Sequence, residues 1–585
     1  MNRFVLTSVL VLALAVAGTA QLSGSYTVDP SGSGPTNFTS MSAAVSALTA
    51  GVSAPVTISV KPATYTGLLV MTPIAGTSSV NTVSFICAGA TPAIIDANGG
   101  AVGLFMFDGT SWVTFDNFKI QNYTKFALYM LGFSPGPGAN HNTFNNCDFS
   151  STSTGLYAAQ LDYSDCNTFT NCMFDVGATT SSTTRAIYVN SADDNTFTSC
   201  KFAGGGYLMY HSNSSRNKFY KCEFDGKGSS NYLLFPINSN DSDNLWQNCF
   251  FHDCGASGRA VYGNLSQYGY MFWHNTVIVT TSDTAIYAGN CCAWSRCCSY
   301  RDNIVVNLGT GSCVKYGSNA TTLDYNDFDY NCYYAPNTTK GVVEAENASF
   351  PFKPTSPVGA LAAWKTYYNA NKATILPGGT GAPTPAQAAW DLNSIEGDPG
   401  LVSMTKPYDI HLKSTSPLID AGTTTYVAGT WVSWPATWTI TDDFEGDPRG
   451  TLVDIGADEV AVRIAASGSP TPGGVVTFTL SSAQDGGLSY QCVSSLGNGP
   501  TPLGTRTLPF DLDALFNLST SGALPTIFIK YNGVLDNTGS AKAALAIPQV
   551  AALKGTRIYT SFVTIKLSAP NGIQSISNAE LIIIQ

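Results

Sequence analysis

The chain has 585 residues, and 28 Lys and Arg against 39 Asp and Glu give it a formal net charge of −11. That balance argues against a general affinity for nucleic acid. Charged residues make up only 11% of the chain, which excludes a charged disordered tail, a coiled coil and a typical cytosolic helical enzyme.

The first twenty residues have the pattern of an export signal. Arg3 supplies a positive start, an apolar stretch runs from Phe4 to Ala17, and Gly18-Thr19-Ala20 is a small-residue cleavage site. The stretch is shorter than the ~18 apolar residues that a membrane helix needs, and no later run reaches that length. We therefore expect a signal peptide over residues 1–20, no membrane span, and a mature protein that is secreted or held at the cell surface.

A short pattern, aromatic-x-Asn-x-x-apolar, recurs along the chain. A clear copy is Phe144-Asn145-Asn146-Cys147-Asp148-Phe149. One copy occurs per ~27 residues, which is inside the range of solenoid repeats. The third position of the copies falls at residues 117, 146, 171, 199, 221, 248, 275, 303 and 331.

The composition of the repeat selects a β-solenoid over the other repeat architectures. Phe, Asn and Cys hold the positions where a leucine-rich repeat needs Leu, and the units are too rich in Asn, Ser, Thr and Gly for helical repeats. A β-helix coil fits, with three short strands and three turns stacked at the strand spacing of ~4.8 Å. The sequence therefore predicts an all-β fold built on a parallel β-helix of about nine regular coils.

Two positions of the repeat have structural interpretations. The third position needs a residue that tolerates a left-handed bend, which Asn does. The next position points inward by strand alternation, and stacked residues ~4.8 Å apart are too distant for a disulfide, so we expect buried, reduced thiols there. The asparagines assigned to the bend are Asn146, Asn171, Asn248, Asn275, Asn303 and Asn331, and the inward cysteines are Cys147, Cys172, Cys200, Cys222 and Cys249.

These residues resemble the secreted right-handed parallel β-helix proteins of the pectin-lyase-like architecture. The segment from Gly51 to Phe118 is similar to their opening coils. The closing segment of many such bacterial surface proteins is similar to residues 416–422, 447–449 and 454–459 here. The resemblance covers roughly residues 25–460 and implies the fold, but it does not specify an activity.

The repeat fades after residue 334, and a different pattern begins at Val460. Pro357 followed by Ala360 to Trp364 predicts a short helix. Beyond Val460 short alternating strands follow one another, as in Val475 to Leu480. We therefore expect a β-helix domain over residues 21–459 and a C-terminal β-sandwich over residues 460–585.

A column of tyrosines suggests a binding surface. In Ala186-Ile187-Tyr188-Val189 the apolar neighbours of Tyr188 are expected to point inward, which turns the tyrosine outward. An outer row of aromatic rings suits sugar rings, although the column could instead lie in the core or only stabilise the sheet. The predicted polysaccharide-binding residues are Tyr157, Tyr188, Tyr210, Tyr262 and Tyr287.

The sequence gives weak evidence for catalysis. The acid, base and calcium constellations that the resemblance implies for pectin-degrading enzymes are not found. Arg185, His211 and Arg259 flank the tyrosines and could form a cationic site of the lyase type, or they could be structural. Three functions stay open: polysaccharide binding without catalysis, a polysaccharide lyase, hydrolase or epimerase, and a structural or adhesive spacer.

Two further groups of residues could bind metal. Asp443, Glu445 and Asp447 could hold calcium, or their carboxylates could cap turns, and no other cofactor is predicted. Cys291, Cys292, Cys297 and Cys298 could form disulfides or a soft-metal site. The particular glycan and the oligomeric state do not follow from the sequence.

Overall fold

A computed structural model gives the fold of the chain, which divides into two units: residues 1–219 with 223–244, and residues 220–222 with 245–585. None of the helices described is long and apolar enough to cross a membrane. The predicted signal peptide and Cys291, Cys292 and Cys297 lie outside the described residues, and so does the side chain of Cys298. The structure describes residues 21–150, 156–236, 243–263, 270–288, 298–316, 326–346, 351–375, 391–413, 416–419, 421–423, 440–447, 449, 453–459, 462–482, 485–499, 501–503, 506–537, 539–567 and 569–585.

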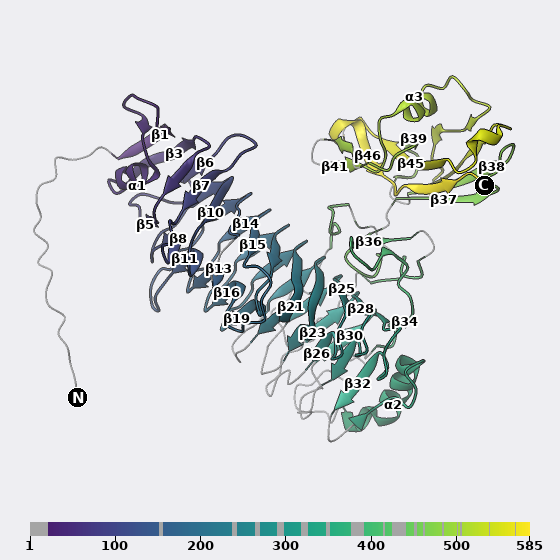
Figure 1. The fold of residues 1–585 in the computed structure, drawn as a ribbon, viewed down its shortest axis with the longest axis horizontal. Helices are drawn as coiled ribbons and strands as arrows, with labels where there is room; N and C mark the ends of the chain where they lie inside the picture. The colour runs from purple at the N-terminus through teal and green to yellow at the C-terminus, as the bar shows by residue number, and fades with distance from the viewer. Residues whose placement is uncertain are drawn as a thin grey trace, which may run out of the picture. The chain divides into compact units, whose positions relative to one another are not determined.

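In the first unit, corresponding strands of successive coils pair in parallel and in register (Figure 1). Phe144 lies opposite Phe115 on one side and Phe169 on the other. Helix α1 (Met41–Leu48) begins at Ser40, whose hydroxyl accepts a hydrogen bond from the Ala43 amide at 3.1 Å. The strands are β1 (Leu22–Val28), β2 (Asn37–Phe38), β3 (Val52–Val60), β4 (Thr64–Thr66), β5 (Leu69–Met71), β6 (Val83–Ile86), β7 (Ala93–Asp96), β8 (Val102–Met106), β9 (Val113–Asp116), β10 (Phe118–Gln121), β11 (Phe126–Leu131), β12 (Thr143–Asn145), β13 (Tyr157–Asp162), β14 (Thr168–Thr170), β15 (Met173–Asp175), β16 (Arg185–Asn190), β17 (Thr196–Thr198), β18 (Lys201–Ala203), β19 (Tyr207–Ser212), β20 (Lys218–Tyr220) and β21 (Glu223–Pro236).

The aromatic positions of the repeat form the core of this unit. The first position gives a stack of fully buried rings, with Phe169 and Phe197 4.7 Å apart between centroids and nearly parallel. The sixth position gives a second stack, in which Phe174 and Phe202 are 4.9 Å apart. Because both positions recur once per coil, identical side chains meet at the strand spacing and bury their faces against each other.

A buried row of asparagines runs beside the first aromatic stack, two residues ahead of each aromatic. The Asn167 amide donates to the side-chain oxygen of Asn195 at 2.9 Å, and the Asn195 amide donates to Asn217 at 2.9 Å. All of its members are fully buried, so each side chain satisfies backbone groups that water cannot reach. The row consists of Asn142, Asn167, Asn195, Asn217 and Asn244.

The bends of the repeat have the left-handed backbone that it needs, with φ of 53° at Asn146 and Asn171 and 54° at Asn248. In the last three copies the predicted register is wrong by one residue. There His274, Asp302 and Tyr330 occupy the bend, with φ of 51°, 57° and 56°. Asn275, Asn303 and Asn331 are instead buried inside the coils.

The same shift explains what these three asparagines do. The Asn275 amide donates to the side-chain oxygen of Asn303 at 2.9 Å, and the Asn303 amide donates to that of Asn331 at 3.0 Å. The Cys249 amide in turn donates to Asn275 at 2.8 Å. Asparagine therefore takes over the inward position that cysteine holds in the earlier copies.

The cysteines of the repeat are all buried thiols. Each sulfur donates to a backbone carbonyl two residues earlier, as Cys147 Sγ does to Asn145 O at 3.2 Å and Cys172 Sγ to Thr170 O at 3.4 Å. Burial raises the pKa of the Cys147 thiol. The same contact is made by Cys200, Cys222 and Cys249.

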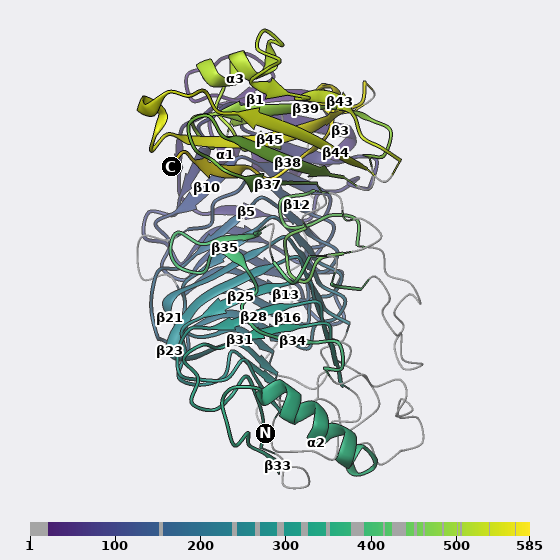
Figure 2. The ribbon, with the colours of Figure 1, turned by 90° about the vertical axis from the view of Figure 1, so that its right-hand side faces the viewer.

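In the second unit, parallel pairing of successive coils is seen again, and Figure 2 shows β25, β28 and β31 following one another. The predicted short helix is present as α2 (Ala360–Ile375), whose buried Trp364 stacks on Tyr316 with 5.1 Å between ring centroids. The strands up to residue 412 are β22 (Leu245–Gln247), β23 (Phe250–Gly263), β24 (Met271–Trp273), β25 (Thr276–Val279), β26 (Ile286–Ala288), β27 (Cys298–Arg301), β28 (Ile304–Asn307), β29 (Val314–Tyr316), β30 (Asn326–Asp329), β31 (Cys332–Tyr334), β32 (Val343–Glu346), β33 (Pro351–Phe352), β34 (Ile395–Glu396), β35 (Leu401–Ser403) and β36 (Asp409–Leu412).

Antiparallel strand pairs first occur at β32–β33 and β35–β36, and after residue 461 all the described strand pairs are antiparallel. One sheet has the order β37-β38-β44-β42, and another has β43-β39-β45-β46 with β47 on β45. Buried Phe478 from the first sheet and Phe562 from the second belong to one hydrophobic core, which is compatible with the expected sandwich. The elements are β37 (Arg463–Gly468), β38 (Val475–Ser481), β39 (Ser489–Ser495), β40 (Thr501–Leu503), β41 (Arg506–Leu508), α3 (Ala514–Thr520), β42 (Phe528–Ile529), β43 (Asn532–Val534), β44 (Ser540–Ala546), β45 (Arg557–Ile565), β46 (Ile573–Ile576) and β47 (Glu580–Ile583), with 3-10 turns at Ala551–Leu553 and Pro570–Gly572.

Candidate functional site

Half-exposed aromatic rings gather on the outer side of strands β8, β11, β13, β16, β19 and β21 in the first unit. Tyr188 shows why they point outward, because its strand neighbours Ile187 and Val189 are fully buried. We call these rings, together with the arginine that lies among them, the aromatic surface. It consists of Phe105, Tyr129, Tyr157, Arg185, Tyr188, Tyr207, Tyr210, Tyr232 and Phe235.

The aromatic surface has two rows and not the single column that the sequence suggested. Tyr188 and Tyr210 lie on consecutive rungs of one row. Tyr157 does not precede them, because it lies opposite Arg185, and Gln160 is the residue opposite Tyr188. The cause is a break in strand alternation after Tyr157, where the next two residues are both buried.

The rings largely cover one another's faces. Phe105 and Tyr129 are stacked with centroids 5.4 Å apart, and Tyr207 and Phe235 at 4.8 Å. The pair Tyr188 and Tyr210 breaks the stacking, with an interplanar angle of 84° at 5.0 Å. The surface therefore offers ring edges and phenol groups along its length, and a change of ring orientation near Tyr188.

Arg185 lies against this change of orientation. Its guanidinium carbon is 5.4 Å from the ring centroid of Tyr157, 5.0 Å from that of Tyr188 and 3.8 Å from that of Tyr210. Its Nη1 donates to the Tyr157 hydroxyl at 2.8 Å. Burial raises the pKa of Tyr188 and Tyr210, so these phenols stay protonated near neutral pH.

One carboxylate, Asp162, adjoins the rows. It accepts hydrogen bonds from the Tyr129 hydroxyl at 2.9 Å, Gln160 Nε2 at 2.7 Å and Asn190 Nδ2 at 2.9 Å. A buried carboxylate that accepts three hydrogen bonds is a structural acceptor.

The three cationic candidates have different surroundings. His211 is fully buried on the other side of β19 from Tyr210, so a chain lying on the aromatic surface could not touch it. Arg259, in the second unit, is paired with Asp283 at 2.6 Å. The burial of His211 favours its structural interpretation, and a cationic site that includes Arg185 and Arg259 stays a prediction.

The second unit has a smaller aromatic pair. Tyr262 and Tyr287 lie on paired strands with ring centroids 5.2 Å apart. Arg259 sits 4.8 Å and 4.5 Å from their centroids. Lys315 lies opposite Tyr287 on the next strand, and the neighbouring Tyr316 is buried.

The acidic closing segment does not bring the predicted calcium ligands to one point. The Asp443 carboxylate accepts from the amides of Gly446, Asp447 and Glu459 at 2.8, 2.7 and 3.1 Å, so it caps a turn. Glu445 lies in a different group with His411 and Asp458, whose ligand atoms are within 4.8 Å of one another. Calcium binding by Asp443, Glu445 and Asp447 stays a prediction.

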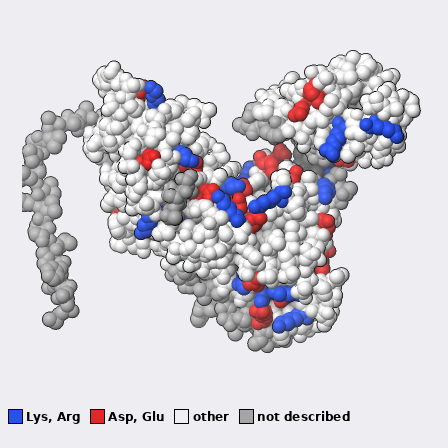
Figure 3. Space-filling view, in the orientation of Figure 1, with Lys and Arg blue, Asp and Glu red and all other residues white. Residues whose placement is uncertain are grey.

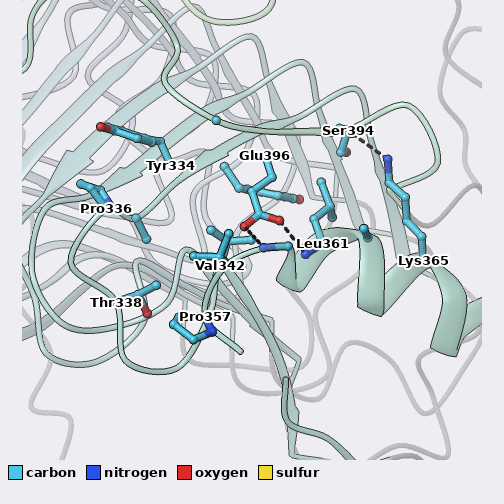
Figure 4. Close-up of a pocket in the computed structure, with 15 residues that line it drawn as sticks. Tyr334, Pro336, Thr338, Val342, Pro357, Leu361, Lys365, Ser394 and Glu396 are labelled. Atoms are coloured by element: carbon cyan, nitrogen blue, oxygen red, sulfur yellow. Dashed lines mark hydrogen bonds between the residues drawn. The ribbon is translucent and has the colours of Figure 1, made fainter. Parts of the chain in front are cut away.

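A pocket of about 570 Å³ lies beside the start of α2 (Figure 4). Its Glu396 carboxylate accepts from the amides of Gly359 at 3.1 Å and Leu361 at 2.9 Å. Its Lys365 ammonium donates to the carbonyls of Leu392 and Ser394 at 3.1 and 2.8 Å. Both charged side chains hold the helix in place, so they are not available to orient a polar ligand.

The comparisons with known proteins agree with the fold. Residues 102–230 and 138–267 match the family described as right handed beta helix region, and with the parallel coils this defines the chain as a right-handed parallel β-helix protein. No curated protein matches the chain.

Solved structures of similar fold include two polysaccharide lyases and a bacteriophage tailspike protein. A mannuronic acid specific polysaccharide family 6 lyase from human gut microbiota is 12% identical over 55% of this chain and 83% of its own, with a TM-score of 0.37. A rhamnogalacturonan lyase is 12% identical over 50% and 82%, with a TM-score of 0.29. Tailspike protein 2 of bacteriophage CBA120 is 9% identical over 92% and 73%, with a TM-score of 0.30. At these identities the likeness concerns the fold alone.

Proposed function

We propose that the protein is exported and binds extracellular polysaccharide along the aromatic surface, without changing it chemically. The observation that carries the proposal is the run of half-exposed aromatic side chains over six strands of one unit. Tyrosine combines an apolar ring with a polar tip, and sugars likewise combine apolar faces with hydroxyls. A polymer can use such a surface because successive coils repeat the same groups at the strand spacing.

The stacking of the rings changes how a glycan would bind. Because Phe105 and Tyr129 already cover each other's faces, sugar rings cannot insert between neighbouring aromatics. Contacts would use ring edges, the tyrosine hydroxyls and the reoriented pair Tyr188 and Tyr210. Many weak contacts of this kind favour long chains over single sugars.

The low charge of the chain also supports the proposal. Only 11% of its residues are charged, and on the face drawn in Figure 3 Lys, Arg, Asp and Glu form separate clusters among mostly uncharged residues. A binding surface of this kind should respond only mildly to salt, unlike one that works through many charges.

The test is a comparison of Tyr188→Ala/Tyr210→Ala with Tyr559→Ala, a half-buried tyrosine of β45. Binding to neutral and acidic polysaccharides would be measured by affinity electrophoresis, and affinity should rise with chain length. Aromatic contacts are worth about 1 kcal/mol each, so the double variant should bind at least about tenfold more weakly, while the control should bind normally.

Three outcomes would overturn the proposal. Failure of the protein to bind any polysaccharide in the panel would favour the structural spacer. Release of unsaturated products or reducing ends during the incubation would make the protein a lyase or hydrolase, and altered sugar configuration without cleavage would make it an epimerase.

A further inference from the structure

We infer that Arg185 makes the aromatic surface selective for acidic polysaccharides, through one carboxylate or sulfate group that completes the surroundings of its guanidinium. This inference rests on the proposed function and names the class of chain that the surface prefers. Its basis is the contrast between two arginines that pack on tyrosine rings in the same manner but have different charge partners.

The two arginines are Arg185 and Arg259. Arg259 lies over two tyrosine rings and its guanidinium is neutralised by Asp283, with Nε and Nη2 donating at 2.9 and 2.6 Å. Arg185 lies over three tyrosine rings, and no carboxylate of the described residues comes within 4.0 Å of it. The second arrangement leaves a positive charge that no carboxylate of the described residues neutralises.

Partial burial of the Arg185 guanidinium strengthens its attraction for an anion. Arg185 is only half-exposed, and its Nε is buried without a hydrogen-bond acceptor. Contact with aromatic faces compensates part of the lost hydration of a guanidinium, but it supplies no hydrogen-bond acceptors. An anion bound to the Arg185 guanidinium is attracted more strongly than it would be by a fully exposed arginine. Water and salt screen the attraction less at a half-buried position.

The geometry leaves donors for such an anion. Nη1 gives a hydrogen bond to the Tyr157 hydroxyl at 2.8 Å, which fixes the plane of the guanidinium between the two rows. Nη2 makes no hydrogen bond to the described residues. An arginine fork binds planar carboxylates and the oxygens of sulfate through paired N–H groups.

Other anionic partners fit less well. The chain carries a net charge of −11, and a single unneutralised arginine does not replace the many cations that a nucleic acid needs. A chain with acidic groups among neutral sugar faces matches one arginine surrounded by tyrosines. Carboxylate and sulfate share this chemistry, so both are tested.

The experiment uses polymer pairs that differ only in charge. Isothermal titration calorimetry would compare polygalacturonate with its fully methyl-esterified form, and dextran sulfate with dextran. The variants are Arg185→Gln, Arg185→Lys and the matched control Arg259→Gln, with circular dichroism to check the fold. Charge-assisted hydrogen bonds lead us to expect about tenfold tighter binding of the acidic member by the unmodified protein.

The three variants and the two polymer pairs should give different results. Arg185→Gln should remove the preference for the acidic member, Arg185→Lys should keep part of it, and Arg259→Gln should keep all of it. A preference for the carboxylate pair or for the sulfate pair identifies the source of the anion.

The inference is overturned if the unmodified protein binds both members of each pair equally, or if Arg185→Gln keeps the preference. In either case binding itself persists and the proposed function stands. If no polymer of either pair or of the wider panel is bound, the proposed function fails, and the inference fails with it.

Discussion

Tyr157 and Arg185 lie opposite each other on paired strands, and Nη1 of the arginine donates to the hydroxyl of the tyrosine at 2.8 Å. Their contact joins the two rows of the aromatic surface, because the same guanidinium also lies over the rings of Tyr188 and Tyr210. The orientation of the one unneutralised cation in the aromatic surface therefore depends on a phenol hydroxyl one strand away.

Removal of that hydroxyl should weaken the preference for acidic chains. In Tyr157→Phe the ring stays and the arginine loses one hydrogen bond of about 1 kcal/mol, so we expect about fivefold weaker binding of the acidic polymers with the fold intact. Tyr262→Phe is the control. Calorimetric affinities would check this, and an unchanged charge preference would show that the rings alone position Arg185.

Residues facing inward and outward should differ in their effect on stability. Phe197 is fully buried between the rings of Phe169 and Phe219, so Phe197→Ala should lower the free energy of unfolding by about 3–5 kcal/mol. Tyr188→Ala/Tyr210→Ala removes half-exposed rings and should cost clearly less. Urea denaturation followed by circular dichroism would measure both, and equal losses would contradict the outward placement of the tyrosines.

The sequence predicted this division for regular coils because the repeat fixes which positions share a face. Phe169 and Phe174 recur once per coil, so both had to form stacks. The row that contains Asn195 was missed, although Asn two residues before the aromatic is a visible signal. Burial of a polar side chain becomes clear only when its partner on the next coil is known.

The candidate site was less predictable, because it depends on local breaks in the pattern. Strict alternation of inward and outward residues would place Tyr157 opposite Tyr188. Two buried residues follow Tyr157 instead, and Arg185 is the residue opposite it. In the later copies the bend falls on His274 and moves Asn275 inside. A shift of one residue reverses the face of a side chain, and spacing alone does not reveal it.

That shift can be tested at Asn303. Its side chain accepts from the Asn275 amide and donates to the Phe272 carbonyl at 2.8 Å, all within the buried interior. Asn303→Ala should cost about 2–4 kcal/mol in the free energy of unfolding because it leaves buried backbone groups without partners. Asn146→Ala, at an exposed bend, should cost about 1 kcal/mol. If both variants lose a similar amount of unfolding free energy in thermal or urea unfolding, the inward placement of Asn303 is contradicted.

The cysteines of the repeat should be unreactive in the folded protein. Their sulfurs are buried, so a thiol reagent cannot reach them in the folded protein. Alkylation followed by mass spectrometry should label them only after unfolding in denaturant. Disulfides mapped between Cys147 and Cys172, or between Cys172 and Cys200, would show that the register of the coils is wrong.

The last prediction concerns pH and Asp391, which is fully buried in the second unit. Its carboxylate accepts from the hydroxyls of Tyr316, Tyr333 and Ser394, each at 2.8 Å, and burial raises its pKa to about 6 from an ordinary value of 3.8. The folded protein therefore holds a proton between pH 4 and 6 that the unfolded chain has released. Its contribution is fully present below about pH 4 and is lost as the pH rises toward 6, by about 3 kcal/mol in total.

Asp391→Asn supplies the comparison that isolates this group. The variant lacks the titrating proton, so the difference in unfolding free energy between it and the unmodified protein should change between pH 4 and 6 and stay constant from pH 7 to 8. Urea unfolding at a series of pH values, followed by tryptophan fluorescence, would measure that difference, since Trp364 packs on Tyr316. A difference that does not depend on pH would mean that the three hydroxyl donors offset burial and that Asp391 titrates normally.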